Sequence, residues 1–249
     1  MNILLLGVDD FAANGFRTDV IMLLSLNPKH NSISLVSFPR DLYVTIPGYW
    51  SNRINTVWGL GGFELLADTF EVNFGIHPQY YMMVNYNGFR DVVNSLDGID
   101  VVVTQELQDS CGRDASGWCI IKPGTVHMDG DMALWYSRSR LTSSDFDRNR
   151  RAQEVVKAIF TKAMNLNMLP KVPELYGLYR EYIDTNVQLL DILPYLPLAS
   201  EVMKTGNINQ YAIGPEVVSN WITAEGAMVL IPNYYGISAI LSEALYLNE

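Results

Sequence analysis

Three short apolar segments stand close together at the start of this chain of 249 residues. They cover Asn2–Val8, Val20–Leu26 and Ser32–Phe38, and Asp, Pro or Asn residues bound each of them. Apolar runs of this length between turn-forming residues are typical of strands that are buried in a sheet. Only Asn27–Asn31 separates the second segment from the third, and its Pro28 favours a tight turn. The chain is therefore predicted to begin with a buried sheet.

Further strands alternate with helices along the rest of the chain. The expected strands are Leu42–Ile46, Tyr80–Val84, Ile99–Thr104 and Met228–Ile231. The expected helices are Phe63–Phe74, Asn87–Leu96, Asp131–Tyr136, Arg148–Leu166, a pair over Leu189–Met203, and Tyr235–Tyr246. Residues 105–127 are predicted to be rich in loops. This alternation predicts an α/β fold, with a core over residues 1–166 and an extension over residues 167–249 that packs on the same domain.

The charge of the chain limits its partners. There are 17 Lys and Arg residues against 27 Asp and Glu residues, which gives a net charge of −10 at pH 7. Such a chain is a poor candidate for nucleic-acid binding as its main function, because the phosphate backbone requires positive charge. The hydrophobic share of 49% is ordinary for a globular protein. Any cluster of arginines stands out against this acidic background.

The start of the chain shows neither a membrane span nor a signal peptide. A span requires about 18 consecutive apolar residues, whereas the early run Ile3–Leu6 is followed at once by Asp9 and Asp10. A basic segment ahead of the run, as in a signal peptide, is also missing. Because a buried strand at the very first residues is unusual, we expect a further segment ahead of Met1.

The two cysteines, Cys111 and Cys119, are eight positions apart. The stretch between them is rich in loop-forming residues, so the spacing allows a disulfide that closes a short loop and contributes about 2–3 kcal/mol. A disulfide favours an oxidising, extracytoplasmic location, whereas two free thiols would fit a reducing cytosol. A zinc site is not expected, because His30, His77 and His127 lack the spacing of metal ligands.

Five arginines lie within fourteen residues, and no lysine lies among them. They are Arg138, Arg140, Arg148, Arg150 and Arg151. The guanidinium group matches phosphate oxygens and keeps its proton. If residues 138–140 are extended, Arg138 and Arg140 point the same way. On the following helix, at about 100° per residue, Arg148 falls within the apolar sector and Arg151 on its border, while Arg150 points away.

Buried guanidiniums require anionic partners. Arg148 and Arg151 are therefore expected to line a pocket that binds an anion, helped by the N-terminus of their helix, and Arg150 is expected to be solvated. In the alternative, Asp145 and Asp147 cap the helix and pair with these arginines.

Charged residues also follow the predicted strands. Asp9 and Asp10 come after the first strand, Arg17 and Asp19 flank the start of the second, and Arg40 and Asp41 follow the third. Ligands of open α/β sheets bind beyond the carboxyl ends of the strands. Carboxylates beside arginines suit Mg²⁺ with a diphosphate, because the metal takes oxygen ligands and bridges phosphates.

Five ordered blocks of sequence lie between residue 1 and about residue 163. They are NILLLGVD at Asn2–Asp9 with Arg17-Thr18-Asp19, SFPRD at Ser37–Asp41 with Ile46-Pro47-Gly48, Arg53-Ile54-Asn55 with Gly61-Gly62, Gly98-Ile99-Asp100-Val101, and Asp129-Gly130 with Ala133-Leu134, Arg138-Ser139-Arg140, Asp145, Arg148, Arg151 and Gln153. Together they resemble the LytR–CpsA–Psr family of bacterial cell-wall glycopolymer ligases. Residues past about 170 lie outside these blocks.

The resemblance implies a mixed central β-sheet flanked by helices, an α-β-α sandwich that encloses an apolar tunnel for a lipid chain. It implies an extracytoplasmic catalytic domain that an N-terminal helix, expected ahead of Met1, attaches to the membrane. The reaction it implies is transfer of a glycopolymer from a polyprenyl-pyrophosphate carrier to a hydroxyl of peptidoglycan, with Mg²⁺ as cofactor.

The resemblance also implies roles for individual residues. Asp9 and Asp19 would bind the metal and act as catalytic carboxylates. Seven arginines would surround the pyrophosphate: Arg17, Arg40, Arg53, Arg138, Arg140, Arg148 and Arg151. Of these, Arg17, Arg40, Arg138 and Arg140 would also be catalytic. Many members have Arg two positions after the first Asp, where this chain has Phe11, and the choice between Asp9 and Asp10 stays open.

Two other functions fit the same residues. A non-catalytic binder of polyprenyl phosphates or wall polymers would keep the arginines and the tunnel without needing a carboxylate. A pyrophosphate hydrolase would use water in place of the sugar hydroxyl. A transcriptional role fits poorly, because the charge is −10 and a helix-turn-helix pattern is missing.

Overall fold

The computed structural model describes residues 1–9, 17–112, 116–141, 144–164, 177, 179 and 181–246. Its chain forms two compact units, and each is described by itself. The first unit combines Met1–Asn85 with Asp184–Glu249, and the second covers Tyr86–Ile183. The two ends of the sequence therefore belong to one unit.

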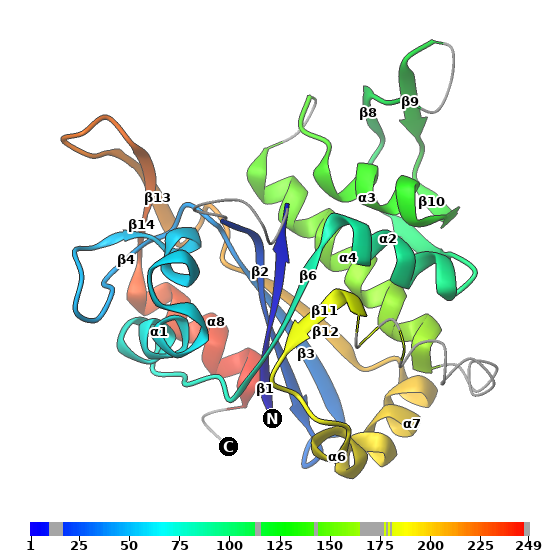
Figure 1. Ribbon diagram of the computed structural model, residues 1–249, viewed down its shortest axis with the longest axis horizontal. Helices are drawn as coiled ribbons and strands as arrows, with labels where there is room; N and C mark the ends of the chain where they lie inside the picture. Colours follow the sequence, from blue (N-terminus) through cyan, green and yellow to red (C-terminus); the bar gives the residue numbers. More distant parts are fainter. Residues whose placement is uncertain are drawn as a thin grey trace. The chain divides into compact units, whose positions relative to one another are not determined.

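A six-stranded sheet forms the centre of the first unit (Figure 1). Its order is β11 (Ile183–Thr185), β6 (Tyr80–Asn85), β1 (Asn2–Val8), β2 (Thr18–Asn27), β3 (Ser32–Phe38) and β12 (Ile208–Ala212). β2 runs antiparallel to β1 and to β3, whereas β6 is parallel to β1 and β12 is parallel to β3. The sheet is thus mixed, as the resemblance implies.

The register of these strands brings their charged neighbours to one edge. Val8, the last residue of β1, pairs with Thr18 at the start of β2 and with Asn85 at the end of β6. Phe38, the last residue of β3, pairs with Ile21 near the same end of β2. The residues that follow β1 and β3 and those that open β2 therefore share this edge of the sheet.

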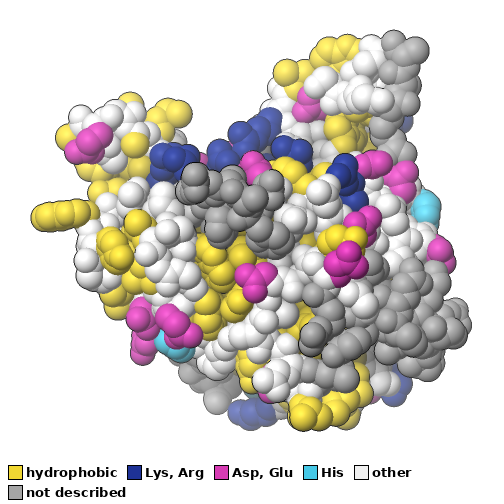
Figure 2. All heavy atoms as spheres, in the orientation of Figure 1, with side chains coloured by type: hydrophobic (Ala, Val, Ile, Leu, Met, Phe, Trp, Pro, Cys, Tyr) yellow, Lys and Arg dark blue, Asp and Glu magenta, His cyan; other side chains and the backbone are white. Residues whose placement is uncertain are grey.

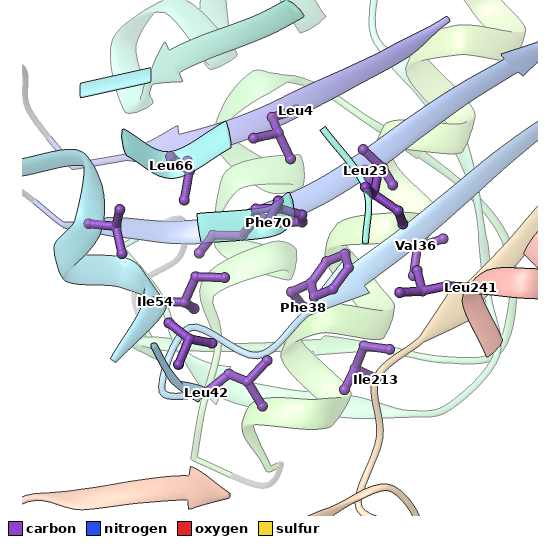
Figure 3. Packing of buried hydrophobic residues seen from close by; sticks show 14 of the residues in the cluster. Leu4, Leu23, Val36, Phe38, Leu42, Ile54, Leu66, Phe70, Ile213 and Leu241 are labelled. Carbon is purple, nitrogen blue, oxygen red and sulfur yellow. The ribbon is translucent and has the colours of Figure 1, made fainter. Parts of the chain in front are cut away.

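Helices α1 (Val57–Phe74) and α8 (Tyr234–Leu245) pack with the sheet around one apolar core. In Figure 3 the side chains of Leu4, Phe38 and Phe70 converge from β1, β3 and α1. The rings of Phe38 and Phe70 meet edge to face with 4.9 Å between their centroids, a favourable arrangement of aromatic rings. Helix α7 (Leu196–Thr205) also contacts β3, so helices flank the sheet.

Smaller elements extend the first unit. Strand β4 (Tyr43–Val44) pairs with β5 (Asn52–Arg53), which leads into the 3₁₀ turn η1 (Ile54–Thr56). A hairpin of β13 (Val218–Ile222) and β14 (Met228–Pro232) reaches the same region, because Leu230 forms a parallel bridge with Leu42. The remaining helical turns are α6 (Leu189–Ile192) and η3 (Leu193–Tyr195).

Over the described residues 86–112, 116–141 and 144–164, the second unit packs three helices with two pairs of strands. The helices are α2 (Tyr86–Ser95), α3 (Gly130–Arg138) and α4 (Asp145–Met164). Strand β7 (Ile99–Val103) pairs antiparallel with β10 (Gly124–Met128), and β8 (Leu107–Ser110) pairs antiparallel with β9 (Trp118–Ile121). Tyr136 of α3 and Val155 of α4 are buried in its apolar core.

The α/β class and the mixed sheet flanked by helices are confirmed. Residues 105–127 were predicted to be rich in loops, and this was wrong, because β8, β9 and β10 lie there. The expected strand at Leu42–Ile46 is reduced to the two residues of β4, and β12 and β13 were not predicted. The compact units also divide the chain differently from the predicted boundary at residues 166/167, since residues 184–249 join the first unit.

The acidic character of the chain shows on its surface. In Figure 2, Asp and Glu side chains lie in several separate places over the visible face. The lobe that corresponds to β13 and β14 shows hydrophobic side chains among polar and acidic ones in the same view, and its Trp221, Ile222 and Met228 are exposed. Among the residues that the structure describes, none of the helices is both long and apolar enough to cross a bilayer.

Candidate functional site

Four charged side chains form a connected set at the sheet edge of the first unit. Arg40 Nη1 donates to Asp19 Oδ1 at 2.5 Å. The Nε atom of Arg40 lies 3.4 Å from Asp41 Oδ2, and Arg53 Nη1 lies 3.3 Å from Asp41 Oδ1. Each of these side chains keeps between 21% and 27% of its surface exposed. Cations and carboxylates thus alternate within reach of solvent.

Backbone hydrogen bonds hold this set in place. The N–H of Ile54 donates to the carbonyl of Leu42 at 2.8 Å, and the N–H of Asn55 donates to the carbonyl of Arg40 at 3.2 Å. These bonds lay the segment that carries Arg53 alongside the segment that carries Arg40. The blocks SFPRD and Arg53-Ile54-Asn55, which are well separated in the sequence, are therefore adjacent in the fold.

Asp9 and Arg17 frame the same edge and are both exposed. Asp9 directly follows β1, and Arg17 directly precedes β2. Asp10 and Phe11 lie outside the described residues, so the choice between Asp9 and Asp10 stays open.

The arrangement suits an anionic ligand. Ion pairs that are open to solvent contribute little to stability, about 0–1 kcal/mol. Stability alone therefore does not explain why Arg40 and Arg53 lie at this edge. Their planar donors can turn toward phosphate oxygens. The carboxylates of Asp9, Asp19 and Asp41 supply the oxygen ligands that Mg²⁺ prefers.

The second unit carries the later arginines. Arg138 is the last residue of α3, and its guanidinium carbon lies 3.9 Å from the ring centroid of Tyr86, a cation–π contact. Ser139 ends the helix with extended backbone angles (φ −53°, ψ 139°). Arg138 itself is helical, so the condition that residues 138–140 are all extended is not met. Arg138 and Arg140 are both exposed.

Arg148 and Arg151 are buried, at 4% and 2% exposure, as their positions on the helical wheel predict. Arg148 Nη1 lies 3.3 Å from Asp145 Oδ1. Arg151 donates from Nε to the carbonyl of Tyr136 at 2.8 Å and from Nη2 to the carbonyl of Ser139. Burial lowers the pKa of Arg151 from its usual value. The Arg151 contacts hold the end of α3, and its binding of a pyrophosphate stays a prediction.

Arg150 differs from the expectation of a solvated side chain. Its Nη1 donates to Thr104 Oγ1 at 2.5 Å and to Glu154 Oε1 at 2.7 Å, and its side chain is 30% exposed. Its partners are Thr104, which directly follows β7, and Glu154 of its own helix. Glu154 also accepts a hydrogen bond of 2.6 Å from the hydroxyl of Tyr136, and burial together with that bond raises the tyrosine pKa.

The start of α4 fits the alternative in which acidic residues cap the helix. Ser144 Oγ accepts the N–H of Asp147 at 3.2 Å, and Asp147 Oδ2 accepts the N–H of Ser144 at 3.0 Å. This reciprocal pair is a capping box. Burial alone would raise the pKa of Asp147, but the hydrogen bonds from Ser144 and the charge of Arg150 lower it overall.

The structure contains a disulfide between Cys111 and Cys119 at the end of the β8–β9 hairpin. Asp109, one residue before the end of β8, is buried and was not singled out in the sequence. A signal for it exists, because Leu107 and Asp109 share the inward face of an alternating strand. That alternation was hidden within residues predicted as loop.

One group of potential metal ligands lies elsewhere in the first unit. Asp68, Glu71 and His77 bring ligand atoms within 4.8 Å of one another, and all three residues are exposed. His77 Nδ1 lies 3.0 Å from Glu71 Oε2. This group was not expected from the spacing of the histidines.

Comparison with known proteins decides the family. The family model described as "LytR_cpsA_psr family" matches residues 1–237. The chain belongs to this family. The match extends well past the five sequence blocks, which end at about residue 163.

Relatives in the LytR_cpsA_psr family include the regulatory protein MsrR and the teichoic acid transferases TagT and TagU. The Regulatory protein MsrR of Staphylococcus aureus is 33% identical over 190 residues, which cover 75% of this chain and 56% of the relative. The polyisoprenyl-teichoic acid–peptidoglycan teichoic acid transferase TagT of Bacillus subtilis is 30% identical over 213 residues, 83% of this chain and 66% of the relative. The chain thus spans little more than half the length of MsrR.

Solved structures of the family share the fold over nearly the whole chain. TagV of Bacillus subtilis has a TM-score of 0.80 at 25% identity, over 99% of this chain and 97% of that one. TagT bound to LIIa-WTA has a TM-score of 0.77 at 26% identity, over 99% and 91%.

Proposed function

We propose that this chain is the catalytic domain of a phosphotransferase that moves a glycopolymer from a polyprenyl-pyrophosphate carrier to a hydroxyl of peptidoglycan. The observation that carries the proposal is the set of Arg40, Arg53, Asp19 and Asp41 at the sheet edge of a LytR_cpsA_psr chain. The names of the relatives TagT and TagU, which are teichoic acid transferases, support this class of reaction.

Seven arginines take part in this proposal: Arg17, Arg40, Arg53, Arg138, Arg140, Arg148 and Arg151. Guanidiniums neutralise the diphosphate and the charge that develops on its oxygens as the bond to the leaving group lengthens. Exposed Arg138 and Arg140 are free of the core and can meet a ligand without unfolding the chain.

A carboxylate, that of Asp19 or of Asp9, is proposed to accept the proton of the attacking hydroxyl. The hydroxyl oxygen forms a bond to the phosphorus that carries the glycopolymer, and the bond from that phosphorus to the bridging oxygen breaks. The electron pair leaves with polyprenyl phosphate, and the hydroxyl proton passes to the carboxylate. Arg40, at 2.5 Å from Asp19, orients the carboxylate for this role.

Mg²⁺ fits the carboxylates of this edge. Asp9 and Asp19 would hold it, because oxygen donors are its preferred ligands. When bound, the ion would neutralise phosphate charge. The apolar interior of the first unit is the proposed place of the lipid chain, and the site of action is proposed to be outside the cytoplasm, with the full-length protein attached to the membrane.

A transfer assay with a polyprenyl-pyrophosphate glycopolymer and peptidoglycan tests the proposal. Arg138→Ala should reduce transfer by at least about hundredfold while the circular dichroism spectrum is unchanged, because Arg138 is exposed at a helix end. The exposed Lys204, paired with Glu201 on α7, gives a matched control in Lys204→Ala. Transfer at the wild-type rate by Arg138→Ala would contradict the assignment.

Asp19→Asn separates the enzyme from its rivals. An enzyme should lose turnover and keep its affinity for the carrier lipid, whereas a non-catalytic binder shows no turnover in the wild-type protein either. Release of phosphate products without peptidoglycan would identify the hydrolase instead.

A further inference from the structure

Asp109 is a buried carboxylate that the proposed chemistry does not use. It is 8% exposed on the inward face of β8. Its Oδ2 accepts the backbone N–H of Arg140 at 2.8 Å and that of Leu141 at 3.1 Å. Its Oδ1 accepts the N–H of Ser110 at 2.7 Å. Three backbone N–H groups thus donate to this carboxylate, and two of them, those of Arg140 and Leu141, lie about thirty residues away in the sequence.

The segment that Asp109 holds is the one that carries Arg138 and Arg140. Helix α3 ends at Arg138, so the amides that follow the extended Ser139 have left the helix and need other acceptors. The Asp109 carboxylate accepts the N–H groups of Arg140 and Leu141. The Arg151 guanidinium donates to the carbonyls of Tyr136 and Ser139. Backbone donors and backbone acceptors at this helix end therefore both have partners.

The hairpin that supplies Asp109 is itself fixed. Trp135 of α3 donates from its indole Nε1 to the carbonyl of Ser110 at 2.8 Å. The disulfide between Cys111 and Cys119 closes the hairpin directly after Ser110. The N–H of Cys111 also donates to the carbonyl of Gly117 at 2.9 Å. Asp109 therefore stands on a rigid support rather than on a loose loop.

The charge of Asp109 makes its presence here informative. A negative charge beside an anion-binding segment repels the anion, so in electrostatic terms a neutral residue would serve a pyrophosphate site better. A carboxylate, however, has acceptor lone pairs for several amides at once, and it holds them more strongly than a neutral acceptor does. Asp109 therefore fixes the backbone conformation of the segment that it binds.

We propose that Asp109 is a positioning residue for the proposed transfer reaction, which sets the Ser139–Leu141 segment so that Arg138 and Arg140 meet the pyrophosphate. It does not touch the substrate. The inference rests on the proposed function, because it assigns a purpose to these two arginines.

The test compares Asp109→Ala and Asp109→Asn in the 249-residue chain, with Glu106→Ala as the control that removes an exposed carboxylate from the same region. Two quantities are measured on folded protein: the affinity for geranylgeranyl pyrophosphate, used as a short polyprenyl probe, and the hydrogen exchange of the Arg140 and Leu141 amides. Asp109→Ala should weaken affinity about tenfold to hundredfold, the loss expected when binding groups are misplaced, and speed exchange at both amides.

Asp109→Asn is the decisive variant. Its amide oxygen can still accept from Arg140 and Leu141, but it holds these N–H groups less strongly than a carboxylate does. The affinity should therefore fall measurably, by less than about tenfold, and exchange at both amides should be somewhat faster than in wild type. If Asp109 acted through its charge alone, both variants would bind the probe more tightly, and the proposal would be wrong. If Asp109→Ala lowered the melting temperature but bound with wild-type affinity, its role would be structural only, and the proposal would again be wrong. Should Asp109→Ala fail to fold, the affinity and exchange of Asp109→Asn decide alone: values equal to those of wild type at both readouts would overturn it.

Arg138→Ala and Arg140→Ala in the same binding assay keep the two claims apart. If both bind the probe as wild type does, the arginine assignment of the proposed function fails. If they bind weakly while the Asp109 variants are unaffected, only the positioning role fails.

Discussion

Arg138 and Arg151 show how one residue type serves two purposes within a single unit. Arg138 is exposed and stacks on the ring of Tyr86, so its guanidinium has donors that a ligand can use. Arg151 is 2% exposed and bonds to two backbone carbonyls. A mutation that lowers activity at Arg138 therefore reports on binding, whereas one at Arg151 reports first on the fold.

Arg151→Ala should lower the free energy of unfolding by about 2–4 kcal/mol, because the carbonyls of Tyr136 and Ser139 would lose a buried charged donor. Urea denaturation followed by circular dichroism measures it. Arg90→Ala is the matched control, since Arg90 is 39% exposed and pairs with the exposed Asp131, and it should cost less than about 1 kcal/mol. Equal costs for the two variants would mean that the Arg151 contacts contribute no more than a surface pair.

The residues of the candidate site could largely be found from the sequence, but their partners could not. The helical wheel predicted that Arg148 and Arg151 are buried, since only spacing along one helix decides that. It could not predict that carbonyls from α3 meet Arg151 or that Thr104 meets Arg150, because those partners come from other elements. Asp109 was missed because the alternation of β8 lies within residues predicted as loop, and its backbone donors could not be predicted because they lie about thirty residues away.

At the scale of elements, the buried strands could be predicted from the sequence and the exposed ones could not. All seven residues of β3 are buried, and such strands read as continuous apolar runs. In β13 four of the five residues are exposed, and β12 is the edge strand with the sequence INQYA. Neither carries an apolar run, so their pairing partners, rather than their own residues, make them strands.

The β8–β9 hairpin should depend on its disulfide. Cys111→Ser combined with Cys119→Ser should lower the free energy of unfolding by about 2–3 kcal/mol, the chain-entropy value for so short a loop. The chain has only these two cysteines, so a reducing agent should reproduce the loss in wild-type protein and leave the double variant unchanged. Identical denaturation midpoints for oxidised and reduced wild-type protein would show that the other hairpin contacts suffice.

At the scale of the whole molecule, the first unit draws on both ends of the sequence. Residues 184–249 supply β12, which pairs with β3, and α8, whose Ile237 and Leu241 lie in the same core as Leu4 and Phe38. The sequence predicts a core over residues 1–166 with residues 167–249 as an extension packed on the same domain, because the prolines past residue 170 interrupt the apolar stretches. A change in amino-acid composition along the chain does not show which core the buried side chains of a segment join.

A chain cut after residue 166 should therefore fail to fold its first unit, although it keeps all five sequence blocks. It would lose the α8 side of the apolar core and leave β3 as an edge strand, paired with β2 on one side and open on the side where β12 pairs, and exposed apolar edges promote aggregation. We expect no cooperative thermal transition for the first unit and a loss of near-ultraviolet circular dichroism. A chain cut after residue 246 is the control, because it keeps α8 complete, and it should melt as the full chain does. A cooperative transition in the shorter chain, with the full chain's near-ultraviolet spectrum, would mean that residues 1–166 form the core by themselves.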